Sequence, residues 1–259
     1  MHIFMSNDDG IEARGLRMLA RGLVDLGEIT LIAPHQECSS SSSALTLRER
    51  LYLKEEHTGE PRFKAFSFTG RPADCAKFGI SYWLQDTPPD LVVSGINNGY
   101  NVGSDVTYSG TVAVAIEGHY EKIPSLAVSG QTFDEEFLER AVPFVRDFIQ
   151  NVFVEGKYPG LLNLNIPNIP EINWQHVKVC RQGLQIYENA ITAAVDENGQ
   201  IYYRVKGRAL PDSDHEDDVY FLHRGWITVT PLTWYQGADQ EIGAVEDLLH
   251  SIAQREVKK

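Results

Sequence analysis

Residues 2–10 are HIFMSNDDG, an apolar run that ends in two adjacent carboxylates, Asp8 and Asp9. The run at 2–5 is typical of a first strand buried in a parallel sheet, so the two carboxylates fall at its carboxyl end, where open α/β sheets bind ligands. Adjacent like charges repel unless a cation lies between them. The stretch therefore predicts a site for a hard divalent cation such as Mg²⁺ or Mn²⁺, which prefers carboxylate oxygens. A solvated Asp-Asp-Gly turn is the simpler alternative for the tripeptide alone.

A strand–helix–strand unit surrounds this loop. Apolar residues recur at helical spacing after it and predict a helix over about 13–26, followed by a strand at 28–33. The crossover should be right-handed, so both strands end at the same edge of the sheet. The next loop, 34–43, contains five consecutive serines at 39–43. Its place at that edge makes it a candidate active-site loop as much as a low-complexity linker.

The alternation of strands and helices continues to residue 166. Strands are expected at 63–68, 91–93, 126–128 and 161–166, and helices at 72–83, 109–117 and 133–154. The strand at 91–93 is followed by a segment, 94–103, that is too rich in Gly and Asn for regular structure. The pattern predicts a doubly wound, mostly parallel, Rossmann-like α/β sheet, with residues 1–170 as the catalytic domain that carries the metal site.

The last third of the chain has a different character. Segments 190–195 and 201–205 flank Asp-Glu-Asn-Gly, a strong hairpin signal, and a strand at 226–229 and a helix at 238–252 follow. We expect residues 171–259 to form an antiparallel hairpin extension and a C-terminal helix outside the catalytic sheet, used for oligomerisation. The acidic residues between 212 and 218 are expected to form a solvated face rather than a second metal site.

Composition narrows the classes of partner. A net charge of −13 over 259 residues argues against binding of long nucleic acids, which needs many Lys and Arg contacts. Cys38, Cys75 and Cys180 are scattered and are expected to be reduced thiols rather than zinc ligands. The sequence shows neither a signal-peptide pattern nor an apolar run of the roughly 20 residues that span a bilayer. We therefore expect a cytoplasmic protein with no membrane partner.

Strand-end loops should bring Ser39 and Asn97 to the carboxylates Asp8 and Asp9. All four offer hard oxygen ligands for one divalent ion. The expected helix start Ser109-Gly110-Thr111 adds backbone N–H groups and two hydroxyls that could donate hydrogen bonds to an anion. Asn101 is a further candidate for binding the phosphate. The combination predicts a phosphoryl-transfer site. Taken alone, Ser-Gly-Thr is also an ordinary helix cap.

Several longer motifs are shared with a known family. They are Ser6-Asn7-Asp8-Asp9-Gly10-Ile11, Ala33-Pro34 with Glu37 and Ser39 leading to Leu45-Thr46-Leu47, Gly70-Arg71-Pro72-Ala73-Asp74-Cys75, 89–97, Tyr108-Ser109-Gly110-Thr111-Val112, 163–167 and 225–232. On these motifs the chain resembles the SurE family of metal-dependent nucleotidases over nearly its whole length.

The resemblance implies both a ligand set and an activity. Asp8, Asp9, Ser39 and Asn97 match the family's metal ligands. The implied activity is a phosphatase acting on nucleoside 5′-monophosphates, and in some members on 3′-monophosphates or short polyphosphate, in a homodimer or homotetramer with exchanged C-terminal elements. The chain departs from the family pattern at His35-Gln36-Glu37-Cys38-Ser39-Ser40, where Asp-Arg-Glu-Arg-Ser-Gly is usual, and at Arg71, where threonine is usual.

Two other functional classes were weighed against the nucleotidase. A haloacid-dehalogenase-type phosphatase needs Asp-x-Asp, which the adjacent Asp8 and Asp9 do not supply. A receiver-like metal-binding switch needs a phosphoacceptor aspartate where this chain has Asn97, and it is much shorter. For the nucleotidase, the favoured mechanism is in-line attack by a metal-held water that Asp8 or Asp9 orients or deprotonates, with direct carboxylate attack left open. His35 lies beside the expected site as a second candidate for proton transfer.

Overall fold

A nine-stranded mixed sheet forms the body of the protein, in the order β3-β4-β2-β1-β5-β6-β7-β13-β8. The structure is a computed structural model that describes residues 1–205, 207–210 and 215–256, with side chains up to residue 250. The six central strands, from β4 to β7, are parallel throughout. Their order is that of the doubly wound Rossmann sheet, in which the chain builds outward from β1 to one side and then returns to the centre and builds to the other side from β5. The predicted fold class is confirmed.

The elements have the following bounds. The strands of the large sheet are β1 (His2–Ser6), β2 (Glu28–Pro34), β3 (Leu53–Glu56), β4 (Phe63–Phe68), β5 (Leu91–Asn98), β6 (Ser125–Gly130), β7 (Leu161–Ile166), β8 (Val177–Val179) and β13 (Ile227–Leu232). The remaining strands are β9 (Tyr187–Glu188), β10 (Ile191–Val195), β11 (Ile201–Val205) and β12 (Arg208–Ala209). The helices are α1 (Arg14–Leu23), α2 (Pro72–Phe78), α3 (Gly110–Tyr120), α4 (Glu135–Ile149), α5 (Asp218–Leu222) and α6 (Ile242–Glu256), and the short helical turns are η1 (Gly79–Trp83), η2 (Gly103–Tyr108), η3 (Gln150–Glu155), η4 (Trp174–His176) and η5 (Asp239–Glu241).

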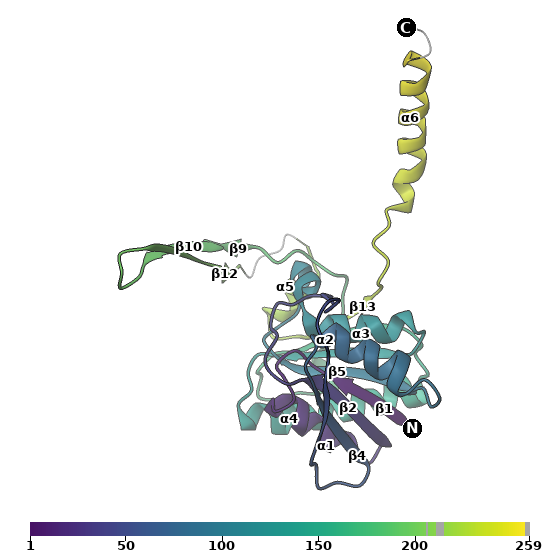
Figure 1. Cartoon of the computed structure of the whole chain (residues 1–259), viewed down its shortest axis with the longest axis vertical. Coiled ribbons are helices and arrows are strands. Elements are labelled where there is room, and N and C mark those ends of the chain that lie inside the picture. Colours follow the sequence, from purple (N-terminus) through teal and green to yellow (C-terminus); the bar gives the residue numbers. More distant parts are fainter. Residues whose placement is uncertain (206, 211–214, 257–259) are drawn as a thin grey trace.

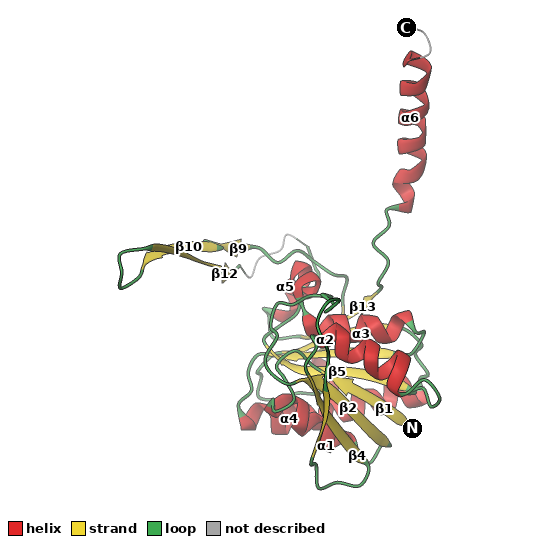
Figure 2. Ribbon diagram, viewed as in Figure 1, coloured by secondary structure: helices red, strands yellow, loops and turns green. Residues whose placement is uncertain are grey.

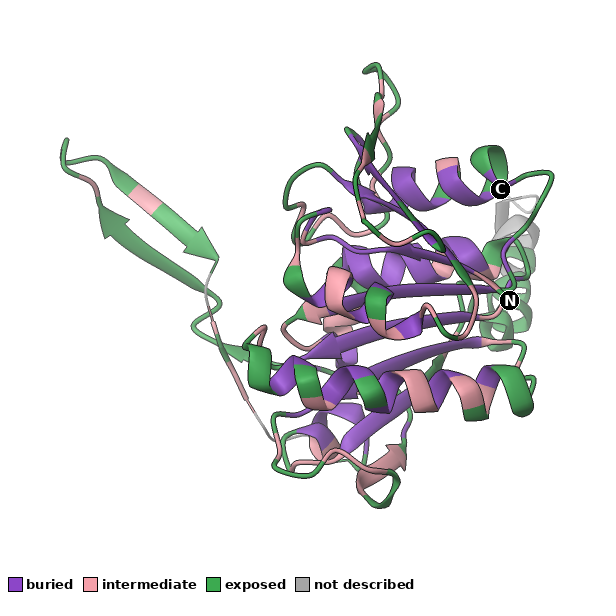
Figure 3. Ribbon diagram, turned by 90° about the horizontal axis from the view of Figure 1, so that it is seen from below, coloured by how far each residue is buried: buried purple, intermediate pink, exposed green. Residues whose placement is uncertain are grey.

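Helices cover both faces of the parallel strands, α1 and α4 on one face and α2 and α3 on the other (Figure 2). The alternation of side chains along β1 shows why. Ile3 and Met5 pack with α1 and α4, whereas Phe4 packs on the opposite side with α2. A strand buried on both faces has no polar side, which is why its sequence is a continuous apolar run. The central parallel strands are accordingly mostly buried in Figure 3.

Strand β5 is longer than the sequence predicted. It continues through Gly95 to Asn98 with a shift of register against β6 between Ser94 and Asn97, instead of ending at 93. Gly95 has a φ of +122°, and a Cβ there would lie 2.2 Å from the Val128 carbonyl oxygen. The glycine that indicated a loop is therefore the residue that lets the strand remain against β6. As a result, Asn97 lies near the carboxyl end of β5.

The strand expected at 226–229 does not lie outside the catalytic sheet. As β13 it pairs antiparallel with β7, with Thr228 opposite Asn165, and its first four residues are buried. That part of the prediction is wrong, because β7 would otherwise leave an open edge and β13 supplies the strand that covers it. The short strands β3 and β8 were not predicted. The proposal that the chain after about residue 170 forms a separate extension therefore applies only to the hairpin and to α6.

The predicted hairpin is present as β10 and β11, which pair antiparallel. Figure 1 shows it projecting from the body on one side, and α6 projecting separately at the end of an extended segment. Where their side chains are described, the two hairpin strands and α6 are exposed except at Tyr202 in β11, which is partly buried. Among the described residues, no helix combines the length and the apolar character needed to cross a membrane.

The acidic run was predicted to be solvated, and for two of its members this is wrong. Residues 211–214 lie outside the described part, but Asp217 and Asp218 are 3% and 0% exposed. Asp217 caps α5 by accepting from the Tyr220 N–H at 3.0 Å. Asp218 accepts from the N–H groups of Gly103 at 2.9 Å and Gly183 at 2.8 Å. Buried carboxylates are stable where backbone donors surround them, and a sequence gives no sign of such donors.

Candidate metal and phosphate site

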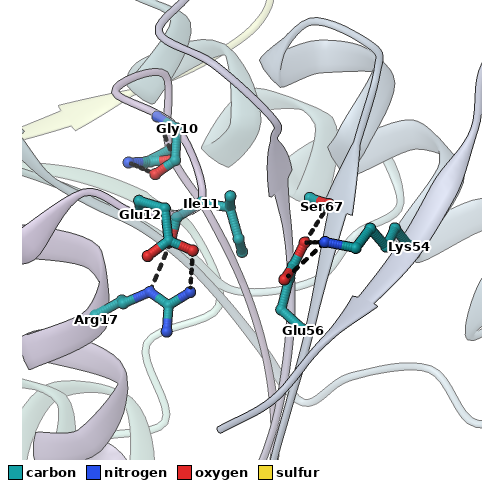
Figure 4. A network of polar contacts seen from close by, with 8 residues as sticks. Gly10, Ile11, Glu12, Arg17, Lys54, Glu56 and Ser67 are labelled. Carbon is teal, nitrogen blue, oxygen red and sulfur yellow. Dashed lines mark hydrogen bonds and ion pairs between the residues drawn. The ribbon is translucent and has the colours of Figure 1, made fainter.

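The loop that carries Asp8 and Asp9 is closed on itself and tied to the next loop. The Asn7 side chain donates to the Gly10 carbonyl at 3.1 Å and accepts from the Gly10 N–H at 3.2 Å. The Cys38 N–H donates to the Asp8 carbonyl at 2.7 Å, so the serine-rich loop is held beside Asp8. Figure 4 shows the outer side of this loop, where Arg17 binds the Ile11 carbonyl and Glu12.

Asp8 lies directly under the start of α3. The residue is 4% exposed, and its carboxylate accepts a hydrogen bond from the Thr111 hydroxyl at 2.5 Å. A Cβ at Gly110 would lie 2.7 Å from the Asp8 Cβ, so the helix packs against the carboxylate without a gap. Burial raises the pKa of Asp8, against the lowering effect of hydrogen bonds from Thr111 and from the backbone at Gly110. A buried carboxylate held by a helix N-terminus is fixed in position and needs a cation to remain charged at low cost.

Asp9 has an oxygen with no partner. Its Oδ2 atom is buried and makes no hydrogen bond within the described part of the chain. Burial, then the charge of Asp8, and to a lesser degree that of Glu37, raise the pKa of Asp9 to about 7. An orphaned buried carboxylate oxygen next to a second carboxylate is the arrangement that a divalent cation would satisfy.

Asn97 and Ser39 complete the predicted ligand set. The Asn97 amide donates through Nδ2 to the Gly99 carbonyl at 2.9 Å, which leaves Oδ1 3.4 Å from the Thr111 hydroxyl that also binds Asp8. The Ser39 hydroxyl donates to Glu37 at 2.8 Å and keeps its lone pairs available. Asp8, Ser39 and Asn97 line one pocket of about 580 Å³. The structure therefore brings together three residues that lie at or just after the carboxyl ends of three different strands, β1, β2 and β5.

The donor set fits a hard ion better than a soft one. No group of three or more His, Cys, Asp or Glu side chains that could hold a metal occurs in the described ranges. A site built from two carboxylates, one amide oxygen and one hydroxyl would not form such a group, and its all-oxygen chemistry suits Mg²⁺ or Mn²⁺.

The four residues predicted to bind phosphate divide into two pairs. Ser109 and Asn101 line the pocket, whereas Gly110 and Thr111 contact Asp8. The Ser109 Oγ caps α3 by accepting from the Val112 N–H at 3.0 Å, so its own proton remains available for another acceptor. The Asn101 amide donates to Ser129 at 2.8 Å. His35 and Arg71 lie in a neighbouring hollow of about 630 Å³ that shares Ser39 and Ser40 with the pocket.

The rest of the pocket wall was not predicted from the sequence. Its other lining residues include Tyr100, Asp105, Tyr108 and, from the base of the hairpin, Tyr187. Spacing along the chain gives no signal for Tyr187, because about 80 residues separate it from η2. The hydrogen bond from the Tyr187 hydroxyl to Asp105 appears only in the folded chain.

The pKa of Asp9 predicts how the stability of the metal-free protein depends on pH. The folded-state pKa, about 7, lies above the ordinary value of 3.8, so the folded protein holds this proton more tightly than the unfolded chain. The resulting stability is complete below the ordinary pKa and is lost as the pH rises through 7. In melting curves recorded with a chelator between pH 4 and pH 8, the melting temperature of Asp9→Asn should therefore rise relative to that of the wild type as the pH rises. Asp86→Asn, at an exposed position, is the matched control. Parallel wild-type and Asp9→Asn curves would contradict the burial of this charge.

Comparison with known proteins identifies the family. The chain matches the family described as Survival protein SurE over residues 3–189. It belongs to the SurE family. Curated SurE relatives include the 5′-nucleotidase SurE of Alkaliphilus metalliredigens, 38% identical over 90% of this chain and 92% of that protein. The 5′-nucleotidase SurE of Thermosipho africanus is 36% identical over 95% of this chain and 97% of its own length. The crystal structure of the SurE protein from Aquifex aeolicus superposes with a TM-score of 0.80 at 31% identity, covering 96% of this chain and 99% of that one.

Membership in the SurE family confirms the resemblance drawn from the motifs. It also decides against the two alternatives, the haloacid-dehalogenase-type phosphatase and the receiver-like switch. The match extends over β13 as well as over the parallel strands, since the aligned relatives cover at least nine-tenths of the chain.

Proposed function

We propose that this protein is a metal-dependent 5′-nucleotidase that hydrolyses nucleoside 5′-monophosphates to a nucleoside and phosphate. The observation that carries the proposal is the pocket where Asp8, Ser39 and Asn97 converge, together with the buried and unpartnered Oδ2 of Asp9, the residue that follows Asp8. The SurE relatives named as 5′-nucleotidases support the choice of substrate. Nucleoside 3′-monophosphates and short polyphosphate belong to the wider range implied by the family resemblance.

The proposed cofactor is one Mg²⁺ or Mn²⁺ ion per subunit, with Asp8, Asp9, Ser39 and Asn97 as its protein ligands. Such an ion, when bound, polarises a phosphoryl oxygen and lowers the pKa of a bound water. The residues around the ligands have the task of fixing them. Thr111 holds Asp8 through its hydroxyl, and the Gly99 carbonyl fixes the Asn97 amide with Oδ1 toward the site.

The other pocket residues act on the substrate. Ser109 donates its free hydroxyl proton to a phosphoryl oxygen while its lone pair caps α3. Asn101 lies in the same wall, positioned by its hydrogen bonds to Ser129 and Asn165. One of the two carboxylates, Asp8 or Asp9, orients the attacking water molecule and accepts a proton from it as the water oxygen bonds to phosphorus. The bond between phosphorus and the nucleoside oxygen breaks, and that oxygen takes up a proton from solvent, so that phosphate and a nucleoside with a free hydroxyl group are released.

Phosphate release from AMP tests the proposal directly. Protein stripped with a chelator should release no phosphate, and adding back Mg²⁺ or Mn²⁺ should restore the release. Asn97→Ala should need a higher metal concentration for half-maximal activity, because it removes one ligand and leaves both carboxylates. Full activity after chelation would overturn the proposal.

Ser109 and Thr111 are expected to respond differently to mutation. Loss of a helix cap costs about 1 kcal/mol, so Ser109→Ala should melt lower and also lose kcat/KM. Ser109→Asp keeps a capping oxygen but places a negative charge near the phosphate, so it should lose more activity than Ser109→Ala. Thr111→Val should weaken metal affinity, because Asp8 loses its hydroxyl partner.

The matched control for the cap is Asp134→Ala at the start of α4. Asp134 accepts from the Phe137 N–H at 2.8 Å and lies outside the pocket. It should lower the melting temperature and leave hydrolysis unchanged. If Ser109→Ala behaved in the same way as Asp134→Ala, Ser109 would be a cap and nothing more.

The proposed assembly is a homodimer or homotetramer formed through the hairpin and α6. Exposed apolar side chains support it: Ile191, Val195, Ile201, Tyr203 and Val205 on the hairpin are between 60% and 90% exposed. A hairpin with so much apolar surface is rarely left uncovered. Replacing residues 191–205 by a Gly-Gly turn should therefore reduce the number of subunits in the assembly, as calculated from the mass measured by light scattering. A shortened chain with the mass of the wild-type assembly would exclude the hairpin as the interface.

A further inference from the structure

Part of the pocket wall is aromatic. Three tyrosines line it together with the proposed metal ligands: Tyr100 after β5, Tyr108 at the end of η2, and Tyr187 in β9 at the base of the hairpin. Tyr108 and Tyr187 are 64% and 41% exposed. Tyr100 is more deeply placed, and its hydroxyl donates to Gln131 at 3.0 Å. Tyr108 and Tyr187 therefore present the more open rings, and they come from two segments far apart in the sequence.

Tyr187 is held in this wall by contacts between the hairpin base and η2. Its hydroxyl donates to the Asp105 carboxylate. Nearby, the Ser104 hydroxyl donates to the Gln185 carbonyl at 3.2 Å, and the Gln182 amide donates to the Gly103 carbonyl at 2.8 Å. Gly103 leaves no space between the two segments, since a Cβ there would lie 2.6 Å from the Gln185 nitrogen. The ring of Tyr187 is thus positioned before any substrate enters.

The protonation state of Tyr187 also favours a ring that is held in place. Burial, and to a lesser degree the hydrogen bond and the charge of Asp105, raise the pKa of Tyr187. The tyrosine therefore stays protonated at neutral pH and continues to donate to Asp105. A neutral ring anchored by its hydroxyl can stack on another aromatic ring without a change in its own geometry.

The pocket thus combines an oxygen-rich site with open tyrosine faces, as a nucleotide combines a phosphate with an aromatic base. We propose that Tyr187 and Tyr108 stack on the nucleobase, and that Tyr187 is the residue by which the enzyme distinguishes nucleotides from phosphate esters without a base. Asp105 is a positioning residue that acts through Tyr187. This inference rests on the proposed nucleotidase function, which it deepens by assigning the binding site of the leaving group.

The test compares AMP with ribose 5-phosphate, which has the same phosphate and sugar but no base. Tyr187→Ala should lower the ratio of kcat/KM for AMP to kcat/KM for ribose 5-phosphate by about fivefold to 150-fold, the range that corresponds to about 1–3 kcal/mol for stacking on one base. Tyr187→Phe keeps the ring and should keep most of the ratio. Asp105→Ala should lower the ratio, and Asp105→Asn, whose amide oxygen accepts the same hydrogen bond, should restore it.

Tyr82→Ala is the control for loss of an exposed tyrosine ring, because Tyr82, which is 64% exposed against 41% for Tyr187, lies on η1, outside the pocket. Its ratio should equal that of the wild type. If Tyr187→Ala hydrolyses both esters with an unchanged ratio, or loses both equally, the inference is overturned and the nucleotidase proposal stands. If the wild type releases no metal-dependent phosphate from either ester, the nucleotidase proposal itself fails. Melting curves of each variant separate a loss of folding from a loss of stacking, and Tyr187→Leu provides a second non-aromatic variant with a larger side chain.

Discussion

Asp8→Asn and Asp9→Asn are each expected to reduce kcat/KM for AMP by about a hundredfold or more. A bound divalent ion contributes several kcal/mol of charge stabilisation in a phosphoryl-transfer transition state, and each 1.36 kcal/mol is a tenfold change in rate. Either substitution leaves a single carboxylate among the four proposed ligands to hold the ion. The measurement is phosphate release from AMP across a titration with Mn²⁺.

Metal-induced stabilisation gives an independent readout of the same site. A ligand that binds only the folded state raises the melting temperature, so Mn²⁺ should stabilise the wild type and should have little effect on either variant. Asp86→Asn, which removes an exposed carboxylate, should respond to Mn²⁺ as the wild type does. Near-normal turnover by Asp8→Asn or Asp9→Asn at saturating Mn²⁺ would falsify the assignment of that residue as a ligand.

The position of this site could be predicted because burial leaves a mark on the sequence. Strands covered on both faces are mostly apolar, as β1 and β2 are in their buried parts, and a change to polar residues marks where such a strand ends. Once the strand ends are known, the topology of a parallel sheet places Asp8 and Asn97 at one edge. No side-chain geometry is needed for that step, which is why it succeeded from the sequence alone.

The residues that sequence analysis misplaced are those whose environment comes from distant segments. Asp218 was expected in solvent, but it is buried because the backbone N–H groups of Gly103 and Gly183 converge on it. The position of β13 is set by the exposed edge of β7, about 60 residues away in the chain. Tyr187 enters the pocket wall because the hairpin base packs on η2. None of these contacts can be predicted from local composition or periodicity.

The start of α3 combines both kinds of information. Its cap at Ser109 is recognisable from the sequence, but the same signal hides the reason for the glycine that follows. In an ordinary helix the residue after the cap tolerates a side chain. Here that position faces Asp8 and Pro72, and the space between the helix and the Asp8 side chain is already filled. Gly110 therefore sets how closely the helix N-terminus approaches the carboxylate.

Gly110→Ala is consequently expected to have the opposite effect from the usual one. In a helix, alanine is favoured over glycine by about 1 kcal/mol. At Gly110 the added Cβ would lie 2.7 Å from the Asp8 Cβ and 2.9 Å from the Pro72 Cγ, atoms close to buried backbone that have little freedom to move. Overpacking of this kind costs about 1–3 kcal/mol, so the variant should melt lower than the wild type. Displacing a catalytic group by about 1 Å can cost on the order of a hundredfold in rate, and we expect a loss of that order in kcat.

The matched control for Gly110→Ala is Gly243→Ala. Gly243 also lies at the start of a helix, α6, but a Cβ there meets no atom within 4 Å. It should leave both the melting temperature and phosphate release at or above the wild-type values. If Gly110→Ala matched Gly243→Ala in both measurements, the helix would have room to withdraw from Asp8. The close approach of α3 would then be unnecessary for catalysis, and the hydrogen bond from Thr111 would have to hold the carboxylate on its own.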